Sequence, residues 1–308
     1  MFSPADPQTA DKECDENSVR FSLEPSLRGV FRGAPVTPSF RAILHPTDLS
    51  PLSYPAFAHA LRIALAAKAK LYTLHVLRGD VGEGWEAPDV RPRRVLLQWG
   101  FLEDKDRLEA VDAKLGLQIE NITLHRGRSP AYEITHFLDQ HVCDLVVLAT
   151  QGRDGVDRWL HGSVAEAVFR QSAIPTLFVT HGARGFVDQV SGDFRLRRVL
   201  VPVDHSPVPY RAIEAAQIFP RLLTGLDAGI QLVHVGHSAP ELGYPNDQVI
   251  IRYGNVVQTI LDAAVEYDVD FICMPTAGHH GILDALRGST TERVLRHAHC
   301  PLLAIAAA

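Results

Sequence analysis

The chain contains the stretch Arg41-Ala-Ile-Leu-His-Pro-Thr-Asp48 a second time, as Arg197-Arg-Val-Leu-Val-Pro-Val-Asp204. Each copy is a short apolar run that ends in an aspartate. Further landmarks recur in the same order in both halves: Leu74-His-Val76 with Val233-His-Val235, Asp144-Leu-Val-Val-Leu with Asp270-Phe-Ile-Cys-Met, and Gly162-Ser163 with Gly288-Ser289. Landmarks that repeat in one order indicate an internal duplication, which makes each half one structural unit.

Strand-like and helix-like patterns alternate between these landmarks. Short runs that are apolar on both faces are typical of buried parallel strands: Ala42–His45, Leu71–Leu77, Leu145–Ala149 and Thr176–Val179. Helical periodicity marks the segments Tyr54–Ala69, Ala131–His141 and Val164–Gln171, and the same order follows Arg197. We therefore predict an α/β fold made of two tandem, doubly wound, parallel five-stranded sheets of Rossmann-like type, joined by right-handed crossovers.

The second half is shorter by about 30 residues between its second strand and its glycine turn. The first half has Arg93–Leu115 there, with apolar residues at helical spacing, whereas the second has the Pro- and Gly-rich segment Gly236–Asp247. The second repeat is therefore predicted to lack one helix. The expected division is a mobile N-terminal arm at 1–38, repeat 1 at 39–181, a linker at 182–195 and repeat 2 at 196–308.

Composition narrows the class of protein. The chain has 308 residues with 30 Lys and Arg against 36 Asp and Glu, a net charge of -6, which argues against a broad nucleic-acid surface. No apolar run is long enough for a membrane span, and the N-terminal residues lack a signal pattern. The four cysteines form no C-x-x-C pair. We expect a cytoplasmic protein with neither nucleic acid nor membrane as a partner.

A glycine-containing loop follows the fourth strand of each half. It reads Ala149-Thr-Gln-Gly152, nine residues, then Gly162-Ser163 in the first half, and Pro275-Thr-Ala-Gly278, nine residues, then Gly288-Ser289 in the second. This spacing resembles the G-x2-G-x9-G-[ST] motif of the universal stress protein family, whose first strand also ends in an aspartate. The chain resembles a tandem member over roughly residues 40–180 and 196–307. Ala149 and Pro275 depart from the motif, because they replace its first glycine.

Such a loop suits phosphate for physical reasons. Glycines let the backbone approach an anion closely, and a Gly-Ser at a helix start presents free N–H groups at the positive end of the helix dipole. Serine at that place is also a favoured helix cap, so capping alone is the alternative interpretation. Asp48 has a similar alternative, because Pro46-Thr-Asp-Leu-Ser50 is good turn chemistry.

The resemblance implies an adenine nucleotide, expected to be ATP with or without Mg²⁺, and no covalent cofactor. The aspartate would lie near base and sugar, the second-strand valine backbone near adenine, and the loop near phosphates. In repeat 1 the expected binding residues are Asp48, Val76, Ala149, Gly152, Arg153, Gly162 and Ser163. The weaker set in repeat 2 is Asp204, Val235, Gly278, Gly288 and Ser289. Repeat 1 is expected to be the main site, because Pro275 lacks an N–H and Arg153 adds a cation.

We expect binding to order the loop Gly79–Pro92 and to change contacts with an unidentified protein partner, which makes the output regulatory. Two alternatives stay open: an interaction scaffold that binds no nucleotide, and a slow ATP hydrolase. No catalytic residue is assigned, and enzymatic activity is the less favoured interpretation. No metal site is expected either, since His279-His280 and His297-x-His299-Cys300 are better explained as exposed loop and core residues.

The last strands, Thr176–Val179 and Leu302–Ile305, are apolar and would leave bare sheet edges. The resemblance implies that these two edges pair with each other. We therefore expect a monomer with an internal pseudo-dimer, or a homodimer of such chains.

Overall fold

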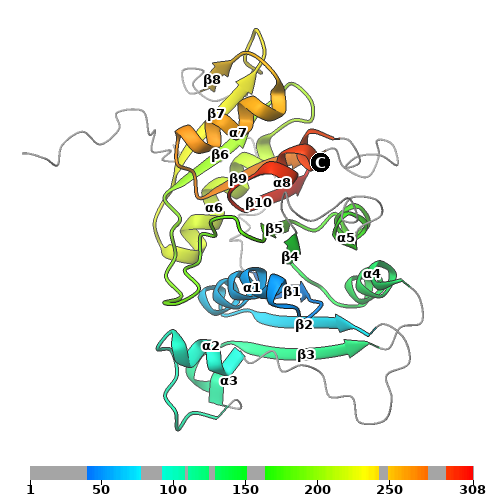
Figure 1. Cartoon of the computed structure of the whole chain (residues 1–308), viewed down its shortest axis with the longest axis vertical. Coiled ribbons are helices and arrows are strands. Elements are labelled where there is room, and N and C mark those ends of the chain that lie inside the picture. The colour runs from blue at the N-terminus through cyan, green and yellow to red at the C-terminus, as the bar shows by residue number, and fades with distance from the viewer. Residues whose placement is uncertain are drawn as a thin grey trace, which may run out of the picture.

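The computed structural model describes residues 40–77, 92–107, 110–124, 129–150, 164–242, 249–276 and 289–307 (Figure 1). Their strands form one ten-stranded sheet in the order β3-β2-β1-β4-β5-β10-β9-β6-β7-β8. The first five are β1 (Ala42–Pro46), β2 (Lys70–Val76), β3 (Gln118–Leu124), β4 (Leu145–Thr150) and β5 (Thr176–Thr180). The second five are β6 (Arg198–Pro202), β7 (Gly229–Val235), β8 (Val249–Arg252), β9 (Phe271–Thr276) and β10 (Leu302–Ala306).

Each half is parallel within itself, which confirms the predicted fold class. The two half-sheets join through β5 and β10, which pair antiparallel with Leu303 opposite Leu177. The expected pairing of the last strands is thus confirmed. Because the strands of one half run antiparallel to those of the other, the carboxyl ends of the strands in the two halves point in opposite directions.

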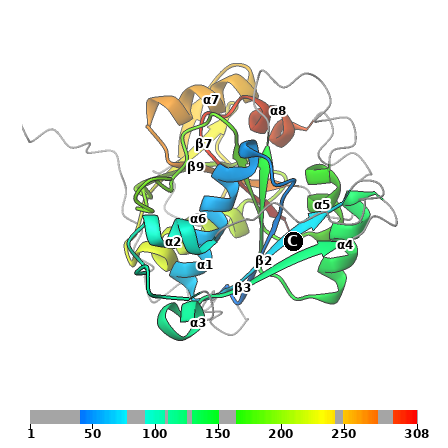
Figure 2. The ribbon, with the colours of Figure 1, turned by 60° about the horizontal axis from the view of Figure 1, so that its bottom comes forward.

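Helices cover both faces of the sheet (Figures 1 and 2). One core contains residues of α1 (Tyr54–Ala67), α2 (Pro92–Gln98), α3 (Ala110–Leu115) and α6 (Tyr210–Thr224). The other contains residues of α4 (Pro130–Gln140), α5 (Val164–Ser172), α7 (Val256–Glu266) and α8 (Thr290–His297). Helices α1 and α6 pack against each other, so this contact adds to the β5–β10 pairing between the halves.

The segment Arg93–Leu115 does not form one helix. It contains two short ones, α2 and α3, because the chain leaves the helical conformation at Gly100, whose φ is +77°. In repeat 2, the described residues 236–242 of the equivalent connection contain no helix, and residues 243–248 lie outside the described residues, so the lack of a helix there stays a prediction. The expected arm at 1–38 lies outside the described residues, and so does the loop Gly79–Pro92 that ligand binding is expected to order, apart from Pro92.

The segment that joins the halves packs into the core. Phe186 is fully buried, and Val187 forms a β-bridge with Phe194. His59 of α1 accepts the backbone N–H of Phe186 at 3.1 Å through Nε2. This segment therefore contacts repeat 1 closely rather than hanging between the repeats.

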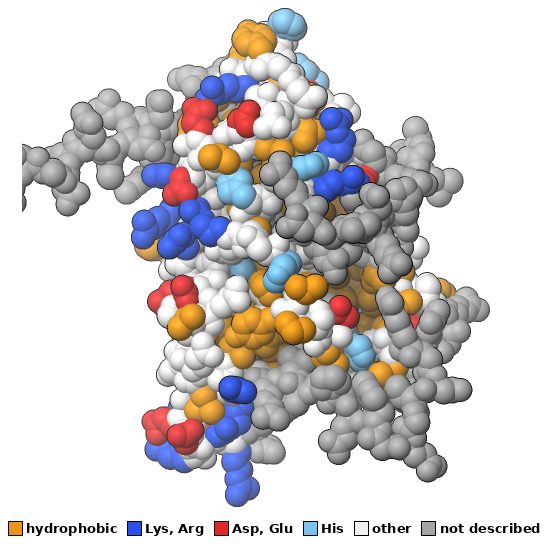
Figure 3. Space-filling model, in the orientation of Figure 1, with side chains coloured by type: hydrophobic (Ala, Val, Ile, Leu, Met, Phe, Trp, Pro, Cys, Tyr) orange, Lys and Arg blue, Asp and Glu red, His pale blue; other side chains and the backbone are white. Residues whose placement is uncertain are grey.

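The surface and the helices add two observations. On the face shown in Figure 3, acidic and basic side chains are interspersed, in keeping with the small net charge. Among the described residues, every helix is too short or too polar to cross a membrane.

Candidate functional site

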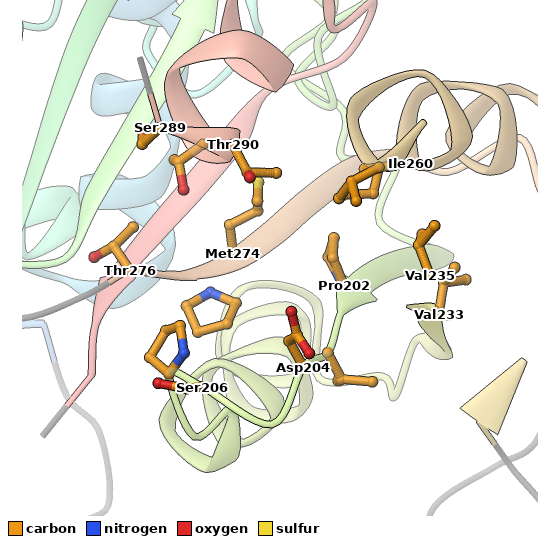
Figure 4. Close-up of a pocket in the computed structure, with 15 residues that line it drawn as sticks. Pro202, Asp204, Ser206, Val233, Val235, Ile260, Met274, Thr276, Ser289 and Thr290 are labelled. Atoms are coloured by element: carbon orange, nitrogen blue, oxygen red, sulfur yellow. The ribbon is translucent and has the colours of Figure 1, made fainter. Parts of the chain in front are cut away.

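A pocket of about 220 Å³ opens at the carboxyl ends of β6, β7 and β9 in the second half (Figure 4). Its described lining consists of Pro202, Val203, Asp204, Ser206, Pro207, Val233, Val235, Val256, Ile260, Met274, Pro275, Thr276, Ser289, Thr290 and Thr291. Helices α7 and α8 contribute the residues beyond the strands. Residues from both ends of the second half therefore meet at one site.

The sheet topology explains why a pocket forms there. Strand β6 lies between β7 and β9, and the helices that follow β6 and β9 pack on opposite faces of the sheet. Connections that leave neighbouring parallel strands toward opposite faces open a crevice at their carboxyl ends, where ligands of such sheets bind. The pocket occupies this switch point.

The pocket has apolar walls and polar ends. Val233, Val235, Ile260 and Met274 supply apolar surface, which suits a flat aromatic ring. Figure 4 shows Asp204 on one side and the hydroxyls of α8's first residues on the other. Of the described lining residues, none is a lysine or an arginine, and Asp204 is the one acidic residue.

Three of the five residues predicted for repeat 2 line this pocket. Asp204 follows β6, Val235 ends β7 and Ser289 precedes α8, so positions up to 85 residues apart converge. The other two, Gly278 and Gly288, lie outside the described residues. Sequence reasoning did not select Met274, Ile260 or Thr290. Their apolar or hydroxyl side chains carry no motif, and their role follows from packing alone.

Ser289 fits both interpretations of the Gly-Ser pair, as a helix cap and as part of a ligand site. Its Oγ accepts the backbone N–H of Glu292 at 3.1 Å, so it caps α8. A hydroxyl that accepts a hydrogen bond keeps its own proton for donation. The capping interpretation is thus confirmed at Ser289, and the same hydroxyl lines the pocket.

Comparison with known proteins agrees with this architecture. A model of the universal stress protein family matches residues 39–180 and 236–306, more than half of the chain. The chain belongs to the universal stress protein family. A universal stress protein from Methanocaldococcus jannaschii is 32% identical over 146 residues, which are 46% of this chain and 82% of that protein.

Two solved structures share the fold over 87% of this chain. A universal stress protein from Archaeoglobus fulgidus is 20% identical with a TM-score of 0.58, covering 87% of this chain and 98% of its own. A functionally unknown protein from Pseudomonas aeruginosa is 17% identical with a TM-score of 0.59, covering 87% and 93%. Another universal stress protein, solved in complex with cAMP, is 22% identical with a TM-score of 0.32, covering 47% and 99%.

Repeat 1 of this universal stress protein places its described candidates at the corresponding strand ends. Asp48 follows β1, Val76 ends β2 and Ala149 lies in β4. Gly152, Arg153, Gly162 and Ser163 lie outside the described residues. The described part of repeat 1 therefore places Asp48, Val76 and Ala149 at or near strand ends, and their roles toward a nucleotide stay predictions, as does the phosphate loop.

Asp48 forms a local turn. Its Oδ1 accepts the backbone N–H of Ser50 at 3.0 Å, as the turn interpretation expects. Burial opposes the charged form of Asp48, but hydrogen bonds from Ser50 and Ser53 lower its pKa below the ordinary value. The side chain is therefore a carboxylate at neutral pH, able to accept hydroxyl or amine donors.

The two halves of the universal stress protein share a histidine contact beside the aspartate. His75 Nδ1 lies 2.9 Å from the carbonyl oxygen of Thr47, and His234 Nδ1 lies 3.0 Å from that of Val203. In both cases the carbonyl belongs to the residue before the aspartate. The equivalent bonds give these two histidines the same structural role in both halves.

Proposed function

We propose that this universal stress protein binds an adenine nucleotide and acts as a regulator rather than as an enzyme. The observation that carries the proposal is the convergence of Asp204, Val235 and Ser289 on one pocket at the switch point of the second half. These positions were selected from the sequence by motif and spacing. Their proximity gives the motif-based expectation a spatial basis.

Each part of the pocket matches a part of the ligand. The apolar walls around Val235 and Met274 suit adenine, and the exposed carboxylate of Asp204 can accept bonds from ribose hydroxyls or the adenine amine. The start of α8 offers the Ser289 hydroxyl and backbone N–H groups at the positive end of the helix dipole, which suits phosphate.

Repeat 1 is proposed as a second site for ATP, with or without Mg²⁺, formed by Asp48, Val76 and Ala149 together with the loop Gly152, Arg153, Gly162 and Ser163. Its support comes from the motif and the matching strand ends. The expectation that repeat 1 is the main site stays a prediction. Since the carboxyl ends of the strands in the two halves point in opposite directions, one nucleotide would not bridge both halves.

A regulatory output is favoured over hydrolysis by the chemistry of the described lining. Its one carboxylate, Asp204, has the imidazoles of His205 and His234 beside it, but neither imidazole lines the pocket and each bonds a backbone carbonyl, whereas general acid–base catalysis needs a partner positioned toward the ligand. The proposal includes a cytoplasmic location and an unidentified protein partner that responds to the bound state. The described cysteines are free and buried, as fits a reducing compartment.

The test uses the purified full-length chain. Denaturation followed by ion-exchange chromatography with mass detection should release adenine nucleotide, and added Mg-ATP or AMP should raise the melting temperature. Asp204→Asn and Asp48→Asn form a matched pair at equivalent positions, so the loss in each variant assigns binding to one repeat. No released nucleotide and no thermal shift at millimolar nucleotide would favour the scaffold alternative.

A further inference from the structure

The two halves differ at the residue after the strand-end aspartate. Repeat 1 has Leu49 after Asp48, whereas repeat 2 has His205 after Asp204. The neighbouring histidine contact is common to both halves, as described above, so it belongs to the shared fold. The second imidazole belongs to repeat 2 alone and is the feature to explain.

Two hydrogen bonds orient His205, one formed by its backbone and one by its imidazole ring. Its backbone N–H donates to Asp204 Oδ1 at 2.8 Å, and its Nε2 donates to the carbonyl oxygen of Ser238 at 3.2 Å. The ring lies edge-on to that of His234, with centroids 5.5 Å apart and planes at 83°. This tautomer leaves Nδ1 of His205 with its lone pair.

One ligand atom from each of Asp204, His205 and His234 lies within 4.8 Å of the other two. Asp204 Oδ1 and His234 Nδ1 are 3.8 Å apart. Two imidazoles and a carboxylate are the ligands that zinc and similar divalent transition metals take in proteins, often with a further position left open. We propose that these three side chains bind such a metal ion beside the pocket of repeat 2.

Metal binding requires the three ligand atoms to move slightly closer together. Ligand atoms at about 2.1 Å from a tetrahedral zinc lie about 3.4 Å from one another. Asp204 and His205 are exposed and can move by that difference, while His234 is buried and stays in place. His234 Nδ1 exchanges the Val203 carbonyl for the metal, and its proton moves to Nε2.

The backbone holds the buried ligand. A Cβ at Gly236 would lie 2.4 Å from His234 Nε2, so the glycine allows the chain to pass directly against the ring. The Ser238 carbonyl orients His205 in the same way that backbone carbonyls orient histidines at known metal sites. These partners make the cluster more than a chance gathering of exposed side chains.

A metal here would change what the pocket attracts. The lining that the structure describes contains the negative Asp204 and neither lysine nor arginine. A divalent cation at Asp204 would reverse this local charge and favour an anionic ligand in the pocket. The metal site itself needs no nucleotide, so its test is independent of the proposed function.

The experiment titrates the chelator-treated full-length protein with Zn²⁺ by calorimetry and with Co²⁺ by visible absorption, without nucleotide. We expect one strong site per chain with the absorption of tetrahedral Co²⁺. His205→Leu, which installs the residue of repeat 1 at an exposed position, should weaken binding at least about tenfold, as should Asp204→Asn.

Two variants serve as controls. Asp48→Asn changes the equivalent aspartate of repeat 1, and His297→Leu removes an exposed histidine of α8; both should bind metal like the unaltered chain. Absence of binding at 100-fold excess metal would overturn the proposal. Binding that His205→Leu leaves unchanged would overturn it equally, because the metal would then occupy other residues.

Discussion

Nε2 of His59 accepts the backbone N–H groups of both Phe186 and Val187, at 3.1 and 3.3 Å. Its Nδ1 donates to the Pro55 carbonyl at 2.7 Å, so the buried ring is neutral and uses both nitrogens. His59 thereby fastens the inter-repeat segment to the first helix of repeat 1. Arg62, one turn later, donates through Nε to the Gly192 carbonyl at 2.6 Å and lies over the ring of Phe194.

Gly185→Ala should weaken this contact. A Cβ at Gly185 would lie 2.4 Å from Cε1 of His59, so the segment or the ring must shift, at a cost of about 1–3 kcal/mol in unfolding free energy. Urea unfolding measures it. In a His59→Ala background the same substitution should cost far less, since the ring is gone; an equal cost in both backgrounds would contradict the contact.

Stability should depend on pH through His59. Burial lowers its pKa from 6.5 to about 4, with the Pro55 bond acting in the opposite sense. A histidine that is harder to protonate in the folded state stabilises the fold fully above pH 6.5, and this contribution is lost as the pH falls toward 4. The loss reaches about 3 kcal/mol per such group. His45, with a pKa of about 4, adds a second loss in the same window.

His59→Gln isolates the contribution of one ring, because an amide oxygen can accept the Phe186 N–H without titrating. Between pH 6.5 and 4, the unfolding free energy of the variant should fall less steeply than that of the unaltered chain. The difference between the two slopes should be up to about 1.4 kcal/mol per pH unit. Identical pH dependence in both proteins would show that His59 does not titrate in this window.

Equivalent aspartates immediately precede β4 and β9, the strands that lie next to the central strand of each half. Asp144 Oδ2 accepts the N–H groups of Arg41 and Ala42 at 2.7 and 3.1 Å, and Asp270 Oδ2 accepts those of Arg197 and Arg198 at 2.6 and 3.0 Å. Replacement by alanine should cost about 1–3 kcal/mol at each position.

The cost should be larger for Asp270→Ala, because Asp270 is 4% exposed and Asp144 is only partly buried. Denaturant midpoints at constant m-value measure this. Asparagine, which keeps an acceptor oxygen, should restore part of the stability in both halves. A greater loss at Asp144 would argue against burial as the cause.

Ser289 allows capping to be separated from ligand binding. Aspartate is also a good N-cap, so Ser289→Asp should keep the stability within about 0.5 kcal/mol, whereas Ser289→Ala should lose about 1 kcal/mol. The added carboxylate beside the pocket should repel phosphate and abolish binding of AMP or ATP in repeat 2. Melting temperature and calorimetric affinity give the two readouts.

The control for Ser289 is Ser129, which caps α4 by accepting the Tyr132 N–H. Ser129→Ala should lose similar stability and leave nucleotide affinity unchanged. If Ser289→Asp still bound nucleotide like the unaltered chain, Ser289 would be a cap and nothing more.

The sequence by itself determined the features that depend on local pattern. Apolar runs and helical periodicity placed α1 and the buried strands β1, β2, β4 and β5 to within a few residues, because burial on one or both faces leaves its period in the chain. They gave no range for β3, most of whose residues are exposed or half-buried. The repeated Asp48 and Asp204 identified the duplication. The resemblance to the universal stress protein family, carried by the spacing of the glycine loop, implied the pairing of β5 with β10 and the joint site of Asp204, Val235 and Ser289.

Tertiary structure decided the contacts between residues that share no pattern. Gly100 divided the expected helix over Arg93–Leu115 into two, since a single left-handed residue outweighs the apolar spacing around it. His205 and His234 meet because parallel strands bring their carboxyl ends together, and His59 meets Phe186 across 127 residues. Such contacts depend on how crossovers pack the helices against the sheet, and no local period in the sequence records that packing.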